Sequence, residues 1–167
     1  MKSPLKIFLI LVVAIIPVFS TLSQAGLKPF EVGSIRQILA ARQGQTFLLV
    51  LWSVDCPSCL RELEQLKQLR EKFRPKGLVL ISTDELKYQS AAEAILDATD
   101  LDGFDNWIFG DRYRASLRYQ IDPNWHGELP RAYYYSADHQ RTGHSGLLNR
   151  EHLENWLKQQ TKSGGNT

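Results

Sequence analysis

One stretch of the chain restricts the possible folds more than any other: an apolar segment that leads through a cysteine pair into a helix pattern. Phe47–Trp52 is a continuous apolar run of strand length, typical of a strand covered on both faces of a sheet. Cys56 and Cys59 follow shortly afterwards, separated by Pro and Ser. Behind them, apolar residues recur at helical spacing at Leu60, Leu63, Leu66, Leu69 and Phe73, and we expect the stripe of Leu60, Leu63 and Leu66 to lie in the core. The sequence therefore predicts a Cys-x-x-Cys pair where a buried strand passes into a helix spanning residues 57–73.

This position gives each part of the motif a chemical role. At a helix N-terminus, unsatisfied backbone N–H groups and the helix dipole favour a thiolate at Cys56. Pro57 at the first helical position costs no hydrogen bond. Cys59, one turn further, can attack a mixed disulfide on Cys56. A bond between the two closes so small a loop that it adds little stability, so we predict redox chemistry at Cys56 and Cys59.

The rest of the chain alternates helix and strand patterns and then turns to a hairpin. Ser34 is expected to cap a first helix over Ile35–Arg42. Further strands are expected at Leu78–Ser82, Arg131–Ser136 and His144–Leu147, and further helices at Ser90–Ala98, Arg112–Tyr119 and Arg150–Gln160. This order predicts an α/β fold with a mixed central sheet and helices on both faces.

The N-terminal segment has the pattern of an export signal. Lys2 and Lys6 precede an apolar run, and small residues follow at Ser23 and Ala25, where signal peptidase would cut. We therefore expect residues 1–25 to be a signal peptide. The apolar run is shorter than the roughly 20 residues of a membrane span, and a retained N-terminal anchor is the alternative. Either case places the protein in the periplasm or another extracytoplasmic compartment, where thiols are oxidised.

Residues 26–162 are then expected to form a single domain, followed by a disordered tail at 163–167. Cleavage would remove two lysines and no acids, which leaves 18 basic residues against 18 acidic ones. A neutral domain without a basic stripe gives no reason to expect nucleic acid as a partner.

Other uses of the cysteines remain open. A structural zinc site needs four ligands, and the histidines that would complete one show no tight ligand spacing: His126, His139, His144 and His152. Ser53 and Cys56 form a Ser-x-x-Cys pattern that a peroxidase would use, although it does not explain Cys59 as directly. A non-catalytic module that binds a metal or a partner is the rival outside the enzymes.

The segment Leu49–Leu66 resembles the TlpA/ResA group of bacterial thioredoxin-like proteins, and the resemblance extends more loosely over residues 34–157. Trp52 stands four positions before the first cysteine, as in that group. The resemblance implies a thioredoxin-like fold and thiol–disulfide exchange, in the reducing direction, with exported proteins, cytochrome c maturation being one process served. It implies no diffusible cofactor and a membrane thiol reductase as the electron donor. An oxidase that donates its disulfide is the alternative, because Pro57 and Ser58 do not decide the direction.

The same resemblance implies further site residues. Glu62 matches the glutamate six positions after the first cysteine, which would tune the pair or relay a proton. The alternative for Glu62 is an acid that interacts favourably with the helix dipole. Pro130 matches the cis-proline before a later strand, and Leu129 would pair through its backbone with a substrate. An ordinary turn proline is the alternative. Trp52 would form a wall beside the cysteines.

Two positions depart from the related patterns. Asp55 stands directly before Cys56, where many members of the group carry an aromatic residue, and a carboxylate there opposes thiolate formation. Val50 occupies the position of the buried acid of thioredoxin, so Glu62 is the candidate for any proton relay. In the loop 122–130, Trp125 is expected in the core.

Overall fold

A computed structural model describes residues 26–73, 77–110 and 112–163. The expected signal peptide at residues 1–25 and all but the first residue of the expected tail lie outside this part of the chain. None of the helices in the described ranges is long and apolar enough to cross a membrane.

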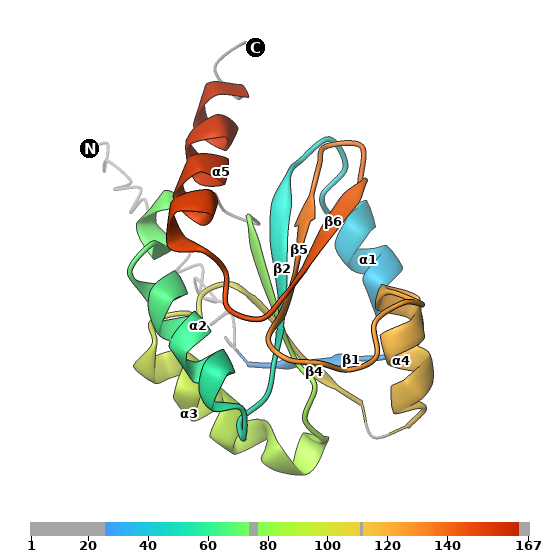
Figure 1. The fold of residues 1–167 in the computed structure, drawn as a ribbon. Helices are drawn as coiled ribbons and strands as arrows, with labels where there is room; N and C mark the ends of the chain where they lie inside the picture. The colour runs from blue at the N-terminus through green and yellow to red at the C-terminus, as the bar shows by residue number, and fades with distance from the viewer. Residues whose placement is uncertain (1–25, 74–76, 111, 164–167) are drawn as a thin grey trace, which may run out of the picture.

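The part of the chain that the structure describes is built around a mixed sheet of six strands, in the order β1-β4-β3-β2-β5-β6 (Figure 1). The strands are β1 (Lys28–Phe30), β2 (Phe47–Trp52), β3 (Leu78–Ser82), β4 (Asp105–Phe109), β5 (Arg131–Tyr135) and β6 (Arg141–Ser145). The strands β1, β4, β3 and β2 run parallel to one another, whereas β5 is antiparallel to both β2 and β6. The predicted mixed sheet is confirmed.

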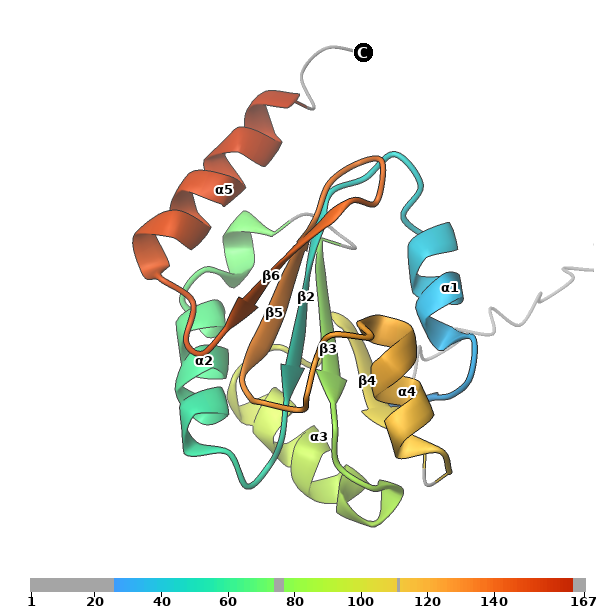
Figure 2. The same cartoon turned by 45° about the vertical axis from the view of Figure 1, so that its right-hand side comes forward.

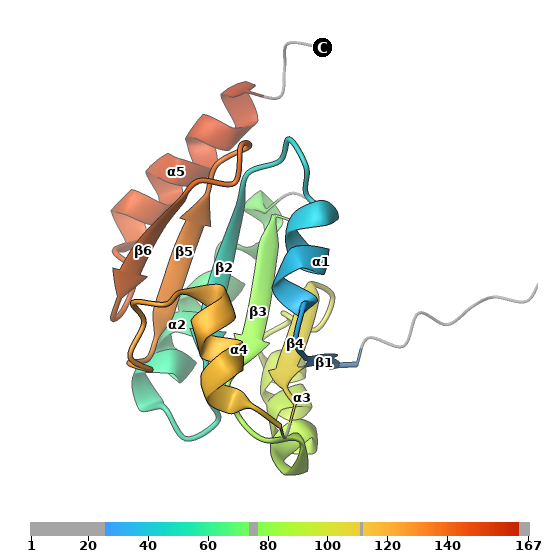
Figure 3. The same ribbon diagram turned by 90° about the vertical axis from the view of Figure 1, so that its right-hand side faces the viewer.

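Within the described ranges, five α-helices cover the two faces of this sheet. They are α1 (Ser34–Ala40), α2 (Pro57–Lys67), α3 (Gln89–Ala98), α4 (Arg114–Ile121) and α5 (Arg150–Ser163). Figures 2 and 3 show α2, α3 and α5 on one face and α1 with α4 on the other. Alternate residues of β2 therefore enter two separate cores: Val50 faces the first, and Leu49 and Leu51 face the second. This explains why β2 is apolar throughout.

The helix after the cysteines is shorter than predicted. α2 ends at Lys67, and a 3₁₀ turn over Arg70–Lys72 follows it. Leu69 and Phe73 are nevertheless buried, because the turn directs both side chains back into the core. Helical spacing of apolar residues therefore did not distinguish one long helix from a helix followed by a turn. The structure also corrects Leu60, which we expected in the core and which is 38% exposed.

The start of α1 differs from the expected cap. Gly33 occupies the N-cap position with a φ of 96°, a conformation that favours glycine. Ser34 is instead the first helical residue, and its hydroxyl accepts a hydrogen bond from the backbone N–H of Glu31 at 2.8 Å. The hydroxyl thus fixes the chain before the helix rather than the first turn within it.

Two parallel strands lay outside the prediction. β4 has the sequence Asp-Asn-Trp-Ile-Phe, and its first two residues are poor strand formers. Asn106 is tolerated there because its side-chain amide donates to the carbonyls of Leu101 and Asp102, both at 2.9 Å. β1 has only three residues. The edge strand β6 begins at Arg141, three residues before the predicted one.

Candidate active site

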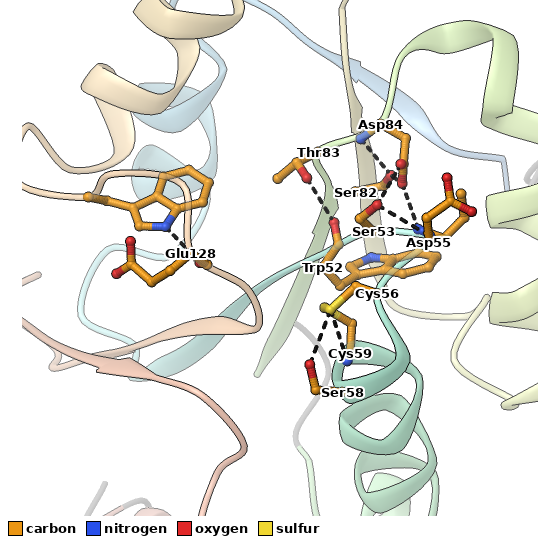
Figure 4. The surroundings of a disulfide bond; sticks show 12 residues. Trp52, Ser53, Asp55, Cys56, Ser58, Cys59, Ser82, Thr83, Asp84 and Glu128 are labelled. Carbon is orange, nitrogen blue, oxygen red and sulfur yellow. Dashed lines mark hydrogen bonds between the residues drawn. A yellow bond between two sulfur atoms is a disulfide. The ribbon is translucent and has the colours of Figure 1, made fainter.

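Cys56 and Cys59 form a disulfide at the start of α2, with their Cα atoms 5.1 Å apart (Figure 4). Cys56 is the N-cap residue of the helix, and its sulfur accepts a hydrogen bond from the backbone N–H of Cys59 at 3.2 Å. The hydroxyl of Ser58 lies 3.4 Å from the same sulfur. Cys56 is half-buried, whereas Cys59 is fully buried.

This arrangement distinguishes the two sulfurs chemically. A backbone N–H that points at the Cys56 sulfur, together with the positive end of the helix dipole, stabilises negative charge on it. Only Cys56 presents surface to a partner, so it can act as the attacking thiolate, and Cys59 can act as the resolving one. The side chain of Asp55 is exposed, so solvent and salt screen its opposing charge.

A carboxylate from the neighbouring strand joins the site, and our sequence predictions did not include it. Asp84 follows β3 and is 8% exposed. It accepts hydrogen bonds from the hydroxyl of Ser53 at 2.7 Å and from the backbone N–H of Val54 at 2.9 Å. The available signal was its position, because an acid just after β3 lies at the same sheet edge as the turn that follows β2.

Trp52 lies inside the core. Its side chain has no exposed surface and packs in the same apolar cluster as Cys59. Its carbonyl accepts hydrogen bonds from the backbone N–H and the hydroxyl of Thr83, at 2.8 and 3.2 Å. Trp52 therefore lies in the core behind the cysteine pair and offers no surface to a partner in this conformation, and its role as a wall beside the cysteines stays a prediction.

Glu62 lies one turn beyond Cys59 on the buried side of α2 and is 1% exposed. Its Oε2 accepts a hydrogen bond from the backbone N–H of Leu148 at 2.8 Å, and its Oε1 has no partner among the described residues. Burial raises the pKa of Glu62, although the Leu148 N–H and the nearby His144 partly offset this effect. The carboxylate is thus enclosed by the core rather than placed on the surface of the helix.

The peptide bond between Leu129 and Pro130 is cis, as the resemblance implied. Because β5 runs antiparallel to β2, the residues just before β5 lie beside the carboxyl end of β2. There the turn over residues 53–56, here called the cysteine turn, begins. Pro130 is buried, and its carbonyl accepts a hydrogen bond from Gly146 at 2.9 Å. Leu129 is half-buried and packs against both cores.

The loop before this proline has a packed interior. Trp125 is 4% exposed, and its indole N–H donates to the carbonyl of Glu128 at 2.9 Å, which confirms the predicted core position. His126 next to it is exposed. Across the residues that the structure describes, no group of three or more His, Cys, Asp or Glu side chains is arranged to hold a metal ion.

The chain shares its fold with solved structures. No protein-family model matches the chain, and no curated protein matches it significantly in sequence. A secreted disulfide oxidoreductase of Mycobacterium tuberculosis, homologous to Escherichia coli DsbE, superposes with a TM-score of 0.55 at 18% identity, over 72% of this chain and 85% of that one. The DsbF homologue of Corynebacterium diphtheriae gives 0.58 at 15% identity, over 72% and 75%. The thioredoxin domain of a Bacteroides vulgatus thiol–disulfide oxidoreductase gives 0.56 at 15% identity, over 72% and 82%.

The fold is thioredoxin-like. The predicted fold class is therefore confirmed. Within the thioredoxin-like fold, the site draws on three separate elements at one edge of the sheet: the cysteines at the start of α2, Asp84 at the end of β3, and the cis-proline at the start of β5. The sequence prediction supplied the first and the third of these elements.

Proposed function

We propose that this protein is a thiol–disulfide oxidoreductase that works through Cys56 and Cys59. The observation that carries the proposal is the half-buried Cys56 sulfur at the N-terminus of α2, 3.2 Å from the backbone N–H of its own resolving cysteine. A structural disulfide has no need of this asymmetry between the two sulfurs. The solved proteins with the same fold include disulfide oxidoreductases, which supports the same conclusion.

In the reducing direction, the reaction exchanges one disulfide for another. The thiolate of Cys56 attacks one sulfur of a partner's disulfide, forms a mixed disulfide, and releases the other partner sulfur, which takes up a proton. Cys59 then loses its proton and attacks the Cys56 sulfur. The second partner sulfur leaves as a thiolate and takes up a proton, and the Cys56–Cys59 bond forms. Two electrons and two protons have passed to the partner, and another dithiol protein must return them.

Glu62 is suited to handle the proton in the second step. Its enclosed carboxylate has one oxygen without a partner among the described residues and lies one helical turn from Cys59, and its raised pKa brings it closer to that of a thiol. A base whose pKa approaches the working pH is the more effective one. In this proposal Glu62 accepts the proton of Cys59 as Cys59 attacks.

The partner binds beside the cis peptide. Leu129 precedes β5 and lies beside the cysteine turn. Among the described residues, no hydrogen bond uses the backbone N–H or C=O of Leu129. An extended peptide can pair with such groups as an added strand. Leu129 and Pro130 would thus align the partner's disulfide with Cys56, while Trp52 holds the pair from within the core.

The protein acts outside the cytoplasm in this proposal. Residues 1–25 have the pattern of an export signal, and the similar Mycobacterium tuberculosis protein is described as secreted. Its substrates would be exported proteins that carry thiols or disulfides, and a membrane thiol reductase would supply the electrons. The remaining thioredoxin-like domain then works in a compartment where disulfides persist.

Two cysteine variants test the mechanism. Cys56→Ser should abolish the reduction of insulin. The readout is the precipitation of insulin upon reduction. Cys59→Ser retains the attacking sulfur and should accumulate mixed disulfides, visible as covalent adducts on non-reducing gels. An exposed serine on α3 offers a control, and Ser90→Ala should reduce insulin at the normal rate. Retained insulin reduction by Cys56→Ser would refute the proposal.

The direction of electron flow depends on the reduction potential of the Cys56–Cys59 couple, measured by equilibration with a thiol buffer and alkylation. A reductase should give a value near that of thioredoxin, roughly −270 mV. A value near roughly −120 mV would instead mean a disulfide oxidase.

A further inference from the structure

We infer that Asp84 is a positioning residue for the cysteine turn. It acts through Ser53 and Val54 to place the Cys56 sulfur on the N–H of Cys59. This inference rests on the proposed function and adds to it a residue from outside the Cys-x-x-Cys motif.

Both carboxylate oxygens of Asp84 are occupied by groups of the turn and of β3. Oδ1 accepts from the Ser53 hydroxyl at 2.7 Å, and Oδ2 accepts from the Val54 N–H at 2.9 Å and from the Ser82 hydroxyl at 2.6 Å. The side chain is almost fully buried, where hydrogen bonds to a charged group are strongest and hold their partners most firmly. Figure 4 shows the carboxylate directed at the serines on the two adjacent strand ends.

Ser53 passes this restraint on to Cys56. The Ser53 hydroxyl, while donating to Asp84, accepts a hydrogen bond from the backbone N–H of Asp55 at 3.4 Å. The Ser53 carbonyl accepts one from the backbone N–H of Cys56 at 3.2 Å. Fixing Ser53 therefore fixes the two residues that lead into α2, and with them the extended backbone of Cys56 that lets its sulfur cap the helix.

Asp84 is itself held independently of α2. The neighbouring Thr83 donates twice to the carbonyl of Trp52, and its own carbonyl accepts from Arg114 of α4 at 2.6 Å. Arg114 also forms an ion pair with Glu85 at 3.1 Å. The segment that carries Asp84 is thus anchored to β2 and to α4, so it can hold the turn while the cysteines change partners.

A buried negative charge near a cysteine has a second effect of opposite sign. Repulsion by the carboxylate disfavours the thiolate, whereas correct placement on the Cys59 N–H favours it. Other charged side chains near this end of the sheet include Asp55, Glu85, Lys87 and Arg114, together with Glu62 on α2 and Glu128 before the cis-proline. If the charge of Asp84 has the larger effect, neutralising Asp84 makes Cys56 more reactive. If the hydrogen bonds of Asp84 have the larger effect, neutralising it makes Cys56 less reactive. We assign it the second role.

The test measures how fast iodoacetamide alkylates Cys56 in the reduced full-length protein over a range of pH. In Asp84→Asn and in Ser53→Ala, the rate at pH 7 should fall about three- to tenfold, and the midpoint of the pH–rate profile should move upward. Ser53→Thr retains the hydroxyl and should restore the normal profile. Asp105→Asn removes another carboxylate that holds cations, at the amino end of β4, and should leave the profile unchanged.

Several results would overturn the assignment. If the midpoint of the pH–rate profile moves downward in Asp84→Asn, the charge of Asp84 acts directly on Cys56. If the midpoint is unchanged in the folded variants, Asp84 is a purely structural residue. Ser53→Ala retains the other two bonds to Asp84 and decides the matter if Asp84→Asn does not fold. Insulin reduction by the unaltered protein is scored separately. An inactive protein whose variants show the shifted profile would refute the proposed function but not the positioning.

Discussion

At the scale of single residues, Glu62 couples the stability of the fold to pH. Its pKa in the folded protein is raised by burial, so the folded state retains a proton that the unfolded chain has already lost. The free energy of unfolding should therefore fall as the pH rises from the unfolded value, about 4.3, through the raised folded value. Glu62→Gln should lack this fall. Urea unfolding of the oxidised protein at pH 5 and pH 8 measures it.

Glu64→Gln provides the matched control, because Glu64 lies on the exposed side of the same helix. It should show the same pH dependence as the unaltered protein. If Glu62→Gln loses as much stability between the two pH values as the unaltered protein does, ionisation of the enclosed carboxylate is not the cause.

The sequence predicted the site residues that a fixed spacing links to the cysteines, and the family resemblance added Leu129 and Pro130. Asp84, which the pairing of strands brings to the turn, was missed. Glu62 and Cys59 share one helix with Cys56, so their arrangement follows from the helical repeat. Asp84 is about 30 residues away from Ser53 and Val54 along the chain. Its role depends on the pairing of β2 with β3, which no local pattern encodes.

At the scale of elements, the β5–β6 hairpin depends on a glycine. A Cβ at Gly143 would lie 3.2 Å from a ring carbon of Tyr133 and would collide with the guanidinium of Arg131. That guanidinium bonds the Ser145 hydroxyl at 2.6 Å and Asp122 at 3.3 Å. Gly143→Ala should therefore lower the free energy of unfolding by about 1–3 kcal/mol, because Arg131 must leave these partners.

Thermal or urea unfolding checks this prediction, with Gly103→Ala as the control, because a Cβ there meets no atom within 4 Å. Equal stabilities of the two variants would show that Arg131 moves aside without loss.

Strands marked by an unbroken apolar run were predicted well, and elements that depend on tertiary contacts were not. β2 and β3 have the predicted bounds because strands buried on both faces need unbroken apolar runs. β4 begins with Asp105 and Asn106. Asp105 forms ion pairs with Lys28 and Arg42, and Asn106 donates to the loop before the strand. These contacts exist only once the sheet has assembled, so local strand preference could not indicate them.

At the scale of the whole molecule, stability should depend little on the redox state. The two cysteines are only three positions apart, so their bond restricts the unfolded chain weakly, by about 2 kcal/mol at most. Two cores on either side of the sheet hold the fold without it. The reduced protein should therefore stay folded and unfold in urea within about 2 kcal/mol of the oxidised form. Unfolding upon reduction would instead indicate a structural disulfide.

The hydrogen bonds of Asp84 hold residues that precede the cysteine pair, not the residues that lie between the two cysteines. Asp84 bonds to the chain before Cys56, and the hydrogen bonds seen in the described part of the chain do not link it to Pro57 or Ser58, the two residues between the cysteines. Those two positions are thus free to vary while the scaffold around them stays constant. We therefore expect that exchanging Pro57 and Ser58 changes the reduction potential of the pair while the strand ends that carry the turn keep their hydrogen bonds.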